Sequence, residues 1–582
     1  MTVRRVRLVQ VGRERYPAEF LAVAESQSEA AMKPRHPYGA VPVWCTVFFA
    51  LVPSMCAQKA TAPKHAGVPQ DWSQRHIIFS RDTLLQHPDV IYREPRVLHQ
   101  AIQRWEGRFS TIVPGVETTQ TPSTSGSNPV DWNVPLRGRI APNMFPSKFS
   151  FDLAAPPSCA NDYVVFGTTA VGVTGGASNL VAFNNLYAGA GGLCGPAPTV
   201  LFAYNTTTVA GGHIVTSPVL SEDGTKIAFV ESVPAPTPSA IFHVLTWTAN
   251  QGDIGAAAAP TMTSLTFSPL ANSTTSSPWV DFGSDTAYLG ADNGKIYKIT
   301  PVFKGTPKLA VTPWPVTVST GFHLTPPVLD ARLGLLMVGS VNGNLYQINT
   351  ATGFLAAPLI VGRGPHHGIL GAPIVDVTNG TTFVVSANDG TSGVLVEADT
   401  ATLAELAKAP IGLASANLAQ TAVDLFQPAF SDSYFTDPST GVVRLCGTGD
   451  ADITPFQYAF GFTGRTMQTT ASFKQQLLTS PAARCTGWTE VFNPNIGVGG
   501  TDFFFFGLTA DCTAPGNGPS DGCVVVRNSN APFTSLPRAT LAAGPSGIVV
   551  DNISTAGQAS SIYLMPTNGP NNAIKFKQTL GP

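Results

Sequence analysis

The chain has 582 residues, of which 43% are hydrophobic and only 12% are charged. This hydrophobic share is sufficient for a large core, which excludes global disorder. The formal net charge is −2, which excludes a broad basic surface for nucleic acid or for an anionic membrane. The 55 glycines and 49 prolines favour many short strands joined by turns over a helical protein.

The N-terminal part has the layout of a bacterial secretory signal peptide that begins at Met32. Lys33 and Arg35 form a basic start, residues 41–52 form an apolar run, and small residues lead to Ala57. The run is shorter than the ~20 apolar residues of a membrane anchor, so we predict cleavage after Ala57.

Three expectations follow from this layout. Residues 1–31 are predicted to be a mis-called extension, and residues 32–57 are predicted to be a removed signal peptide. The mature protein is then extracytoplasmic, either secreted or periplasmic, and keeps no transmembrane anchor. Lipid attachment at Cys56 is disfavoured, because Pro53-Ser54-Met55 fits a lipid-attachment box poorly.

Six cysteines lie after the predicted signal peptide, and an even number in an exported chain indicates disulfides. They form three pairs of sequence neighbours, which predicts the bridges Cys159–Cys194, Cys446–Cys485 and Cys512–Cys523. Sequence proximity is the only basis for this choice, since other pairings stay open. A metal site at these cysteines is disfavoured, because there is no CxxC and no His lies at ligand spacing.

The rest of the chain divides into three zones. Residues 58–110 are polar and partly helical in pattern, with Leu98, Ile102 and Trp105 on one helical face after Pro95. Residues 111–145 contain the run TTQTPSTSGSNP and are predicted to be a flexible linker. Residues 146–582 contain repeats.

The clearest repeat is GADNGKIYKI at residues 290–299, which returns as GSVNGNLYQI at residues 339–348. Each copy places Asn-Gly between two alternating runs, which predicts a β-hairpin whose two turn residues both take positive φ. Similar hairpins occur before and after these two along the repeating zone.

Each repeat also begins with a proline, and an Asp or Ser follows three residues later. The prolines are 46 to 60 residues apart, and the polar residues are Ser221, Asp281, Asp330, Asp376 and Ser431. Proline suits the start of a strand, and a short polar side chain can bond the backbone of the turn that follows. We therefore interpret these residues as turn formers and not as ligands.

Short strands at this period are typical of an all-β fold, the β-propeller with four strands per blade. Counting hairpins gives eight blades, and seven remains open because the first and last are the least regular. A pair of β-sandwiches is the second architecture considered.

The two Asn-Gly repeats resemble those of the quinoprotein-like propellers, most closely over residues 275–400. That superfamily includes pyrroloquinoline-quinone-dependent alcohol dehydrogenases and non-catalytic outer-membrane assembly factors. The chain also resembles large secreted propeller proteins of environmental bacteria. The enzymes hold their quinone with an adjacent cysteine pair, a stacking Trp and a Glu-Asn-Asp calcium site. The chain has no adjacent cysteines, and its tryptophans share no repeat position. No cofactor is therefore expected, although the quinone and Ca²⁺ are not excluded.

Histidines give the sharpest candidate ligand site. His366 and His367 follow Arg363 in a loop, and His213 and His323 lie at similar positions in other repeats. They could form a ring around one end of a propeller and bind a metal or an anionic ligand. Exposed loop histidines, or histidines that pack between loops, are the simpler interpretation.

These observations favour an exported, non-catalytic propeller that binds a protein or a surface polymer such as a polysaccharide. Residues 232–239 and 512–523 are irregular loops that could carry specificity. The alternative is an exported enzyme, either a quinoprotein oxidoreductase or a hydrolase. No GxSxG, HExxH or P-loop motif supports it. The oligomeric state stays open.

Overall fold

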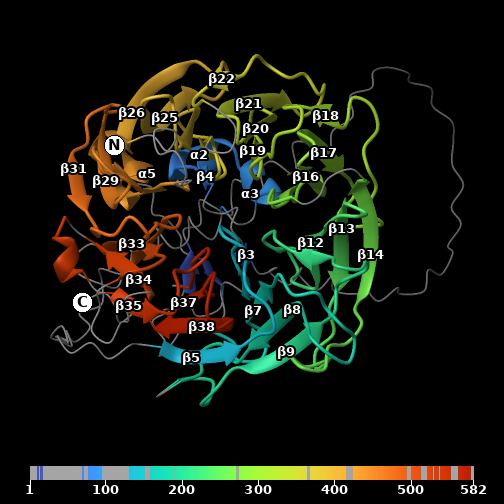
Figure 1. Cartoon of the computed structure of the whole chain (residues 1–582). Coiled ribbons are helices and arrows are strands. Elements are labelled where there is room, and N and C mark those ends of the chain that lie inside the picture. The colour runs from blue at the N-terminus through green and yellow to red at the C-terminus, as the bar shows by residue number, and fades with distance from the viewer. Residues whose placement is uncertain are drawn as a thin grey trace, which may run out of the picture. The chain divides into compact units, whose positions relative to one another are not determined.

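Figure 1 shows the chain as a computed structural model. The structure describes residues 9–11, 14–16, 68–70, 76–94, 97, 130–150, 157–189, 192–269, 274–363, 368–413, 424–493, 500–512, 521–528, 530–536, 538–551 and 561–577. The chain divides into two compact units, residues 1–66 and 67–582. In the first unit, β1 (Val9–Val11) pairs antiparallel with β2 (Glu14–Tyr16). The predicted signal peptide at 32–57 lies outside the described residues.

The second unit is an eight-bladed β-propeller, as eight antiparallel sheets follow one another around a ring (Figure 1). Blade 1 consists of β6 Ser147–Ser150, β7 Tyr163–Gly167, β8 Leu180–Asn184 and β9 Thr199–Tyr204, and blade 2 of β10 His213–Ile214, β11 Val219–Leu220, β12 Lys226–Val233, β13 Ser239–Thr246 and β14 Thr261–Ser268. Blade 3 consists of β15 Trp279–Asp281, β16 Thr286–Gly290, β17 Lys295–Ile299 and β18 Val316–Thr317. Blade 4 consists of β19 Val328–Asp330, β20 Leu335–Gly339, β21 Asn344–Asn349 and β22 Leu359–Ile360.

The last four blades follow the same plan. Blade 5 consists of β23 Ile374–Asp376, β24 Thr381–Ser386, β25 Ser392–Asp399 and β26 Glu405–Leu413, and blade 6 of β27 Ala429–Phe430, β28 Val442–Thr448, β29 Pro455–Thr463, β30 Thr466–Met467 and β31 Phe473–Gln476. Blade 7 consists of β32 Thr489–Asn493, β33 Thr501–Leu508, β34 Gly522–Arg527 and β35 Arg538–Leu541. Blade 8 consists of β36 Val549–Asp551, β37 Ser561–Leu564, β38 Asn572–Lys577 and β5 Val130–Pro135. The propeller prediction is confirmed with the larger blade number, and the β-sandwich pair is wrong.

Strand β5 closes the ring from the N-terminal side. It pairs antiparallel with β38, so that Asn572 lies opposite Pro135 and Ile574 lies opposite Asn133. An N-terminal strand and the three C-terminal strands are thereby joined in blade 8, which closes the ring. The linker prediction is therefore wrong for residues 130–145, because this stretch supplies the outer strand of a blade and the connection into blade 1.

The Asn-Gly hairpins explain why the tyrosine recurs at a fixed place. Asn293 accepts a hydrogen bond from Lys295 N at 3.1 Å and donates one to the Tyr297 hydroxyl at 2.9 Å. Asn342 makes the same two contacts with Asn344 N (3.1 Å) and the Tyr346 hydroxyl (3.2 Å).

The turn type differs from the prediction. Gly294 and Gly343 have φ of +74° and +91°, whereas Asn293 and Asn342 are not among the positive-φ residues. A bond from Ala291 N to Lys295 O closes a longer turn, so only the glycine needs the left-handed region.

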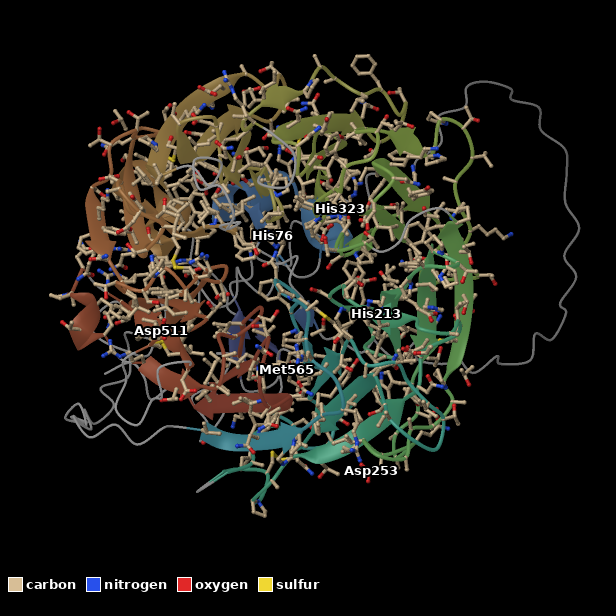
Figure 2. The ribbon with its side chains drawn as sticks, viewed as in Figure 1. His76, His213, Asp253, His323, Asp511 and Met565 are labelled. Carbon is tan, nitrogen blue, oxygen red and sulfur yellow. A yellow bond between two sulfur atoms is a disulfide. The ribbon has the colours of Figure 1, made fainter. Side chains whose placement is uncertain are left out.

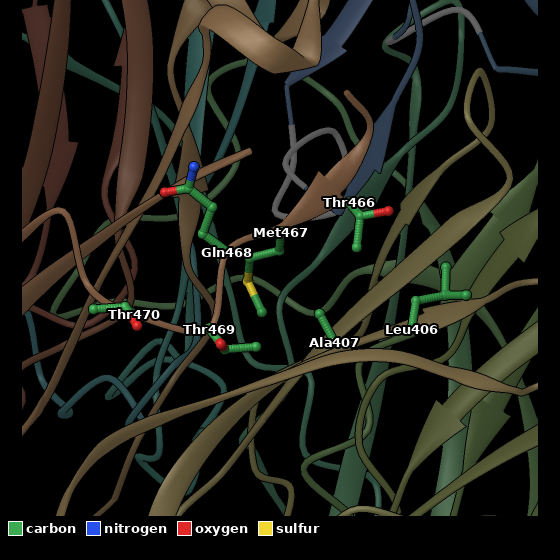
Figure 3. A pocket seen from close by; sticks show the side chains of 7 residues that line it. All are labelled: Leu406, Ala407, Thr466, Met467, Gln468, Thr469 and Thr470. Atoms are coloured by element: carbon green, nitrogen blue, oxygen red, sulfur yellow. The ribbon is translucent and has the colours of Figure 1, made fainter. Parts of the chain in front are cut away.

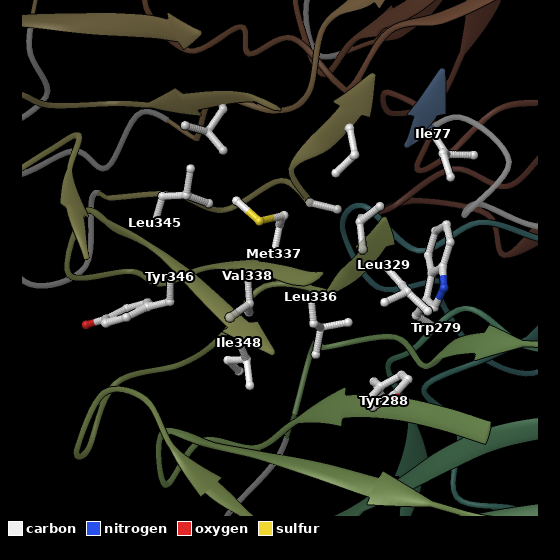
Figure 4. Close-up of a cluster of buried hydrophobic side chains, with 14 of the residues drawn as sticks. Ile77, Trp279, Tyr288, Leu329, Leu336, Met337, Val338, Leu345, Tyr346 and Ile348 are labelled. Carbon is white, nitrogen blue, oxygen red and sulfur yellow. The ribbon is translucent and has the colours of Figure 1, made fainter. Parts of the chain in front are cut away.

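The core lies between neighbouring blades, where the inner faces of adjacent sheets meet. Figure 4 shows Trp279 and Tyr288 of blade 3 beside Leu329 and Leu336 of blade 4, all of them buried. Ile77 belongs to the same cluster. Each blade is thus stabilised by its neighbours, as expected for a radial repeat.

The N-terminal segment of the second unit supplies two further strands and two short helices. Strand β3 (Val68–Gln70) pairs with β6, and β4 (Ile77–Ile78) pairs with β23, each on the innermost strand of its blade. The helices are α2 (Arg81–Gln86), capped by Ser80, and α3 (Asp89–Arg93). The helix pattern at Leu98, Ile102 and Trp105 lies outside the described residues. Blade 6 carries α5 (Asp432–Thr436) and the 3₁₀ turn η4 (Pro438–Thr440), and blade 7 carries η5 (Phe533–Ser535).

The three predicted disulfides are present: Cys159–Cys194, Cys446–Cys485 and Cys512–Cys523. Each bridge joins segments that are close in sequence and belong to one blade or to adjacent blades. Within the described part of the chain, no helix has the length and apolar character needed to cross a membrane.

Candidate functional site

The blade plan assigns the loops to two ends of the ring. The end of the ring at which the innermost strands begin is called the proximal rim. It carries the connections 205–218 and 318–327 and the turns 234–238, 291–294 and 340–343. The distal rim is the opposite end, which carries the turns 221–225, 282–285 and 331–334 and the connections 247–260, 300–315 and 350–358. The antiparallel order of four strands fixes this assignment, because the first and third connections leave at the distal rim.

The repeated Asp and Ser residues lie at the distal rim and act as turn formers, which confirms their interpretation. The Asp376 carboxylate accepts from Thr378 N and Asn379 N, both at 2.9 Å, and Asp330 accepts from Leu333 N at 2.9 Å. The hydroxyls of Ser221 and Ser431 accept from Lys226 N and Val442 N, both at 2.9 Å.

Asp281 has a second partner besides its turn. Its carboxylate accepts from Ser284 Oγ at 2.7 Å and also receives Arg93 of α3 in a bidentate contact, at 2.7 and 3.3 Å. Arg93 Nη1 reaches the Ala331 carbonyl of the next blade at 2.9 Å. Ser80 N and Thr83 Oγ1 donate to Thr378 Oγ1 of blade 5, at 2.7 and 2.8 Å. Residues 76–94 therefore cover part of the distal rim over blades 3 to 5, which gives a structural role to part of the 58–110 segment.

The described members of the predicted ligand set are His213, His323 and Arg363, and they lie on the proximal rim in three different connections between blades. His213 begins β10, and its Nδ1 lies 3.1 Å from the Gly211 carbonyl oxygen. His323 lies before β19, with Nδ1 3.0 Å from Asp292 Oδ1. This hydrogen bond raises the pKa of His323 against the opposing effect of burial. Arg363 follows β22 and is held by its backbone, since its N donates to Asn388 O at 2.7 Å.

Figure 2 shows His213 and His323 as separate side chains. His366 and His367 lie outside the described residues. In the described ranges, no three His, Cys, Asp or Glu side chains are grouped as a metal site. The histidine ring therefore stays a prediction.

The two irregular loops also belong to the proximal rim. Residues 234–238 form the turn between β12 and β13, in which Pro234, Ala235 and Pro236 are exposed. Of the loop 512–523, the structure describes 512 and 521–523, and its ends are joined by the Cys512–Cys523 bridge.

A cavity of about 430 Å³ opens between blades 5 and 6. Leu406 and Ala407 of β26 line one side, and residues 466–470 line the other (Figure 3). Its lining contains hydroxyl and amide groups but no charged side chain. Behind it, Met467 N donates to the buried Glu397 carboxylate at 2.7 Å. Burial raises the pKa of Glu397 to about 7, and Asp376 adds to the effect.

An exposed apolar patch lies at the distal rim on blades 3 and 4. We define the distal patch as Leu309, Val311 and Phe354, whose exposed fractions are 37%, 82% and 67%. The two loops that carry them touch, because a Cβ placed on Gly353 would lie 2.6 Å from Pro313 Cγ. Large exposed apolar side chains on neighbouring loops are typical of a protein contact surface. Sequence reasoning missed this patch, since exposure follows from the loop packing.

No family model matches the chain, and no curated protein matches it. Several solved propeller structures match the chain. BamB from Moraxella catarrhalis is 13% identical, with a TM-score of 0.40, and the match covers 77% of this chain and 97% of BamB. The Dos1 propeller is 12% identical with a TM-score of 0.47, over 78% of this chain and 96% of the other. The C-terminal WD40 domain of Sif2 is 9% identical with a TM-score of 0.42, over 77% and 97%. This similarity concerns the fold alone.

Proposed function

We propose that the protein is an exported β-propeller scaffold that binds a protein partner through the distal patch. The observation that carries the proposal is the exposure of Val311 and Phe354 on two loops that support each other. A residue such as Phe354 costs little entropy to fix in a complex and buries a large apolar area, which are properties of interface hot spots.

The rigidity of the surrounding structure supports a scaffold role. Trp314, three residues after Val311, is buried, and the Lys298 ammonium lies 5.7 Å from its ring centroid. Lys298 Nζ also donates to the Thr350 carbonyl of blade 4 at 3.3 Å. The two patch loops are thus preorganised, which lowers the entropic cost of binding. Export is supported by the layout of residues 32–57 and by the three disulfides.

Site-specific photo-crosslinking in the producing cells tests the proposal. A photoreactive phenylalanine at position 354 should capture one defined protein, whereas the same group at Thr352, in the same loop, should capture much less. Equal capture at the two positions, or no capture at 354, contradicts the proposal.

The captured partner then allows a direct measurement. Val311→Asp should weaken its affinity at least ~10-fold, which corresponds to about 1.4 kcal/mol. The fold should be unaffected, because Val311 is exposed. Thr352→Asp is the matched control and should leave the affinity within ~2-fold. An unchanged Kd in a folded Val311→Asp variant would refute the role of the patch.

A further inference from the structure

Three polar side chains on adjacent strands of blade 2 form a linear hydrogen-bonded series. Glu231 lies on β12, His243 on β13 and Ser264 on β14, and His243 is the direct cross-strand neighbour of Ser264. His243 Nε2 lies 2.9 Å from Glu231 Oε2, and His243 Nδ1 lies 2.9 Å from Ser264 Oγ. A hydroxyl, an imidazole and a carboxylate in this order are the elements of a nucleophile, its base and the group that orients the base.

The carboxylate end of the series is fixed from several sides. Glu231 Oε1 accepts from Thr208 N at 2.8 Å and from Val209 N at 3.2 Å, and the Thr208 hydroxyl donates to Oε2. Burial opposes ionisation, but the hydrogen bonds from His243 and Thr208 outweigh it and lower the pKa of Glu231. Glu231 is therefore ionised at neutral pH.

An ionised Glu231 determines the tautomer of the neutral imidazole. The carboxylate can only accept, so the ring proton must reside on Nε2, and Nδ1 keeps its lone pair. That lone pair points at the Ser264 hydroxyl, which must then donate. The imidazole ring is held in place by Phe229, which stacks on it at a centroid distance of 5.2 Å.

The hydroxyl end of the series is open to solvent. His243 and Glu231 are buried, whereas Ser264 is exposed, as are Thr263 and Thr266 on the same strand. β14 ends the sheet formed by the described strands of blade 2. Alternate backbone N–H groups on its outer edge thus stand outside that ladder and are available to an oxyanion.

We propose that Ser264 is a nucleophile activated by His243 and Glu231, and that it performs acyl transfer on small carboxylic esters. This activity is independent of partner binding at the distal patch. A nucleophile must be accessible to its substrate and needs a base within hydrogen-bonding distance. Ser264 is exposed and its Oγ lies 2.9 Å from His243 Nδ1.

The chemistry balances with water as the second reactant. Ser264 Oγ bonds to the ester carbonyl carbon while its proton passes to His243 Nδ1. The C–O bond to the leaving alcohol then breaks, and the imidazolium returns the proton to that oxygen. Water, deprotonated by Nδ1, attacks the acyl-serine; the bond to Ser264 Oγ breaks, the acid leaves, and the imidazolium returns the proton to Ser264 Oγ. Glu231 stabilises the imidazolium in both halves.

Labelling with a fluorophosphonate probe tests the inference on the full exported chain. Peptide mass spectrometry should find the label on Ser264, and Ser264→Ala should abolish it. Thr263→Ala, also exposed on β14, is the matched control and should be labelled like the wild type. Hydrolysis of p-nitrophenyl acetate should fall at least ~100-fold in His243→Gln, the usual contribution of a general base.

A second measurement remains decisive if the His243 variant does not fold. Ser264 in urea-unfolded wild-type protein should lose its label, since the imidazole is then no longer held beside it. A folded protein whose Ser264 is unlabelled overturns the proposal. Equal labelling in the folded and unfolded states also overturns the proposal, because the reactivity of Ser264 would then not depend on the folded arrangement with His243.

Discussion

Replacing Lys148 with methionine should lower the free energy of unfolding by about 3–5 kcal/mol at pH 8. Lys148 of β6 and Asp551 of β36 meet at the junction of blades 1 and 8, with Nζ and Oδ2 3.0 Å apart and both side chains fully buried. Lys148 Nζ donates to Ser150 Oγ at 2.6 Å, and among the described residues no neutral group donates a hydrogen bond to the Asp551 carboxylate. The Lys148 ammonium is therefore the main group that offsets the cost of burying the Asp551 carboxylate.

The loss should shrink at lower pH. Burial raises the pKa of Asp551, whereas Lys148 lowers it. Without the lysine, this pKa rises further, so the carboxyl binds a proton more readily in the folded than in the unfolded state. Lys148→Met should therefore be much less destabilising at pH 5 than at pH 8. Urea unfolding, followed by tryptophan fluorescence at both pH values, measures the difference.

Two controls separate the buried pair from a general effect of charge removal. Lys148→Met combined with Asp551→Leu should recover most of the loss, since no buried charge is left alone. Lys474→Met removes a lysine from an exposed pair with Asp450, and should cost less than about 1 kcal/mol. Similar losses in Lys148→Met and Lys474→Met would show that the junction does not depend on the buried pair.

Local patterns predicted the blades, because each blade is built from strands that follow one another in sequence. The Asn-Gly hairpins and the three disulfides were found this way, since both join near neighbours. The turn type was wrong because an Asn-Gly pair fits both the two-residue turn and the longer one, and only the strand register decides between them.

Contacts between distant segments could not be predicted from the same patterns. Strand β5 pairs with β38 across more than 400 residues, and β4 pairs with β23 across almost 300. A two-residue strand such as Ile77–Ile78 has no period of its own, and it forms because an innermost strand offers a free edge. The linker was consequently predicted too long.

The predicted and the observed candidate sites differ for a related reason. Equivalent positions in a propeller lie at equivalent places of separate blades, so His213 and His323 have separate partners. Glu231, His243 and Ser264 meet because they lie on adjacent strands of one blade. The contact between His243 and Glu231 could have been predicted from the hairpin pairing of β12 with β13, since this pairing places His243 opposite Phe229 and near Glu231. The position of Ser264 could not, because it depends on the register of a third strand, β14.

Glu397 should make the protein less stable as the pH rises from about 4.5 to about 8. Its pKa is about 7 in the folded state, against an ordinary value of 4.5. Below pH 4.5 the carboxyl is protonated in both states and adds no difference. Between the two pKa values the unfolded chain loses the proton first, so unfolding becomes easier; above pH 7 the full difference of about 3 kcal/mol is reached.

Glu397→Gln removes this dependence, because an amide cannot ionise. The variant should match the wild type near pH 4.5 and exceed its free energy of unfolding by up to about 3 kcal/mol at pH 8. Glu405→Gln on the neighbouring strand β26 is the matched control; Glu405 is exposed, so this change should shift neither curve by more than about 0.5 kcal/mol. Denaturant titrations at several pH values distinguish the variants. Parallel curves for wild type and Glu397→Gln would mean that Glu397 is already ionised at low pH.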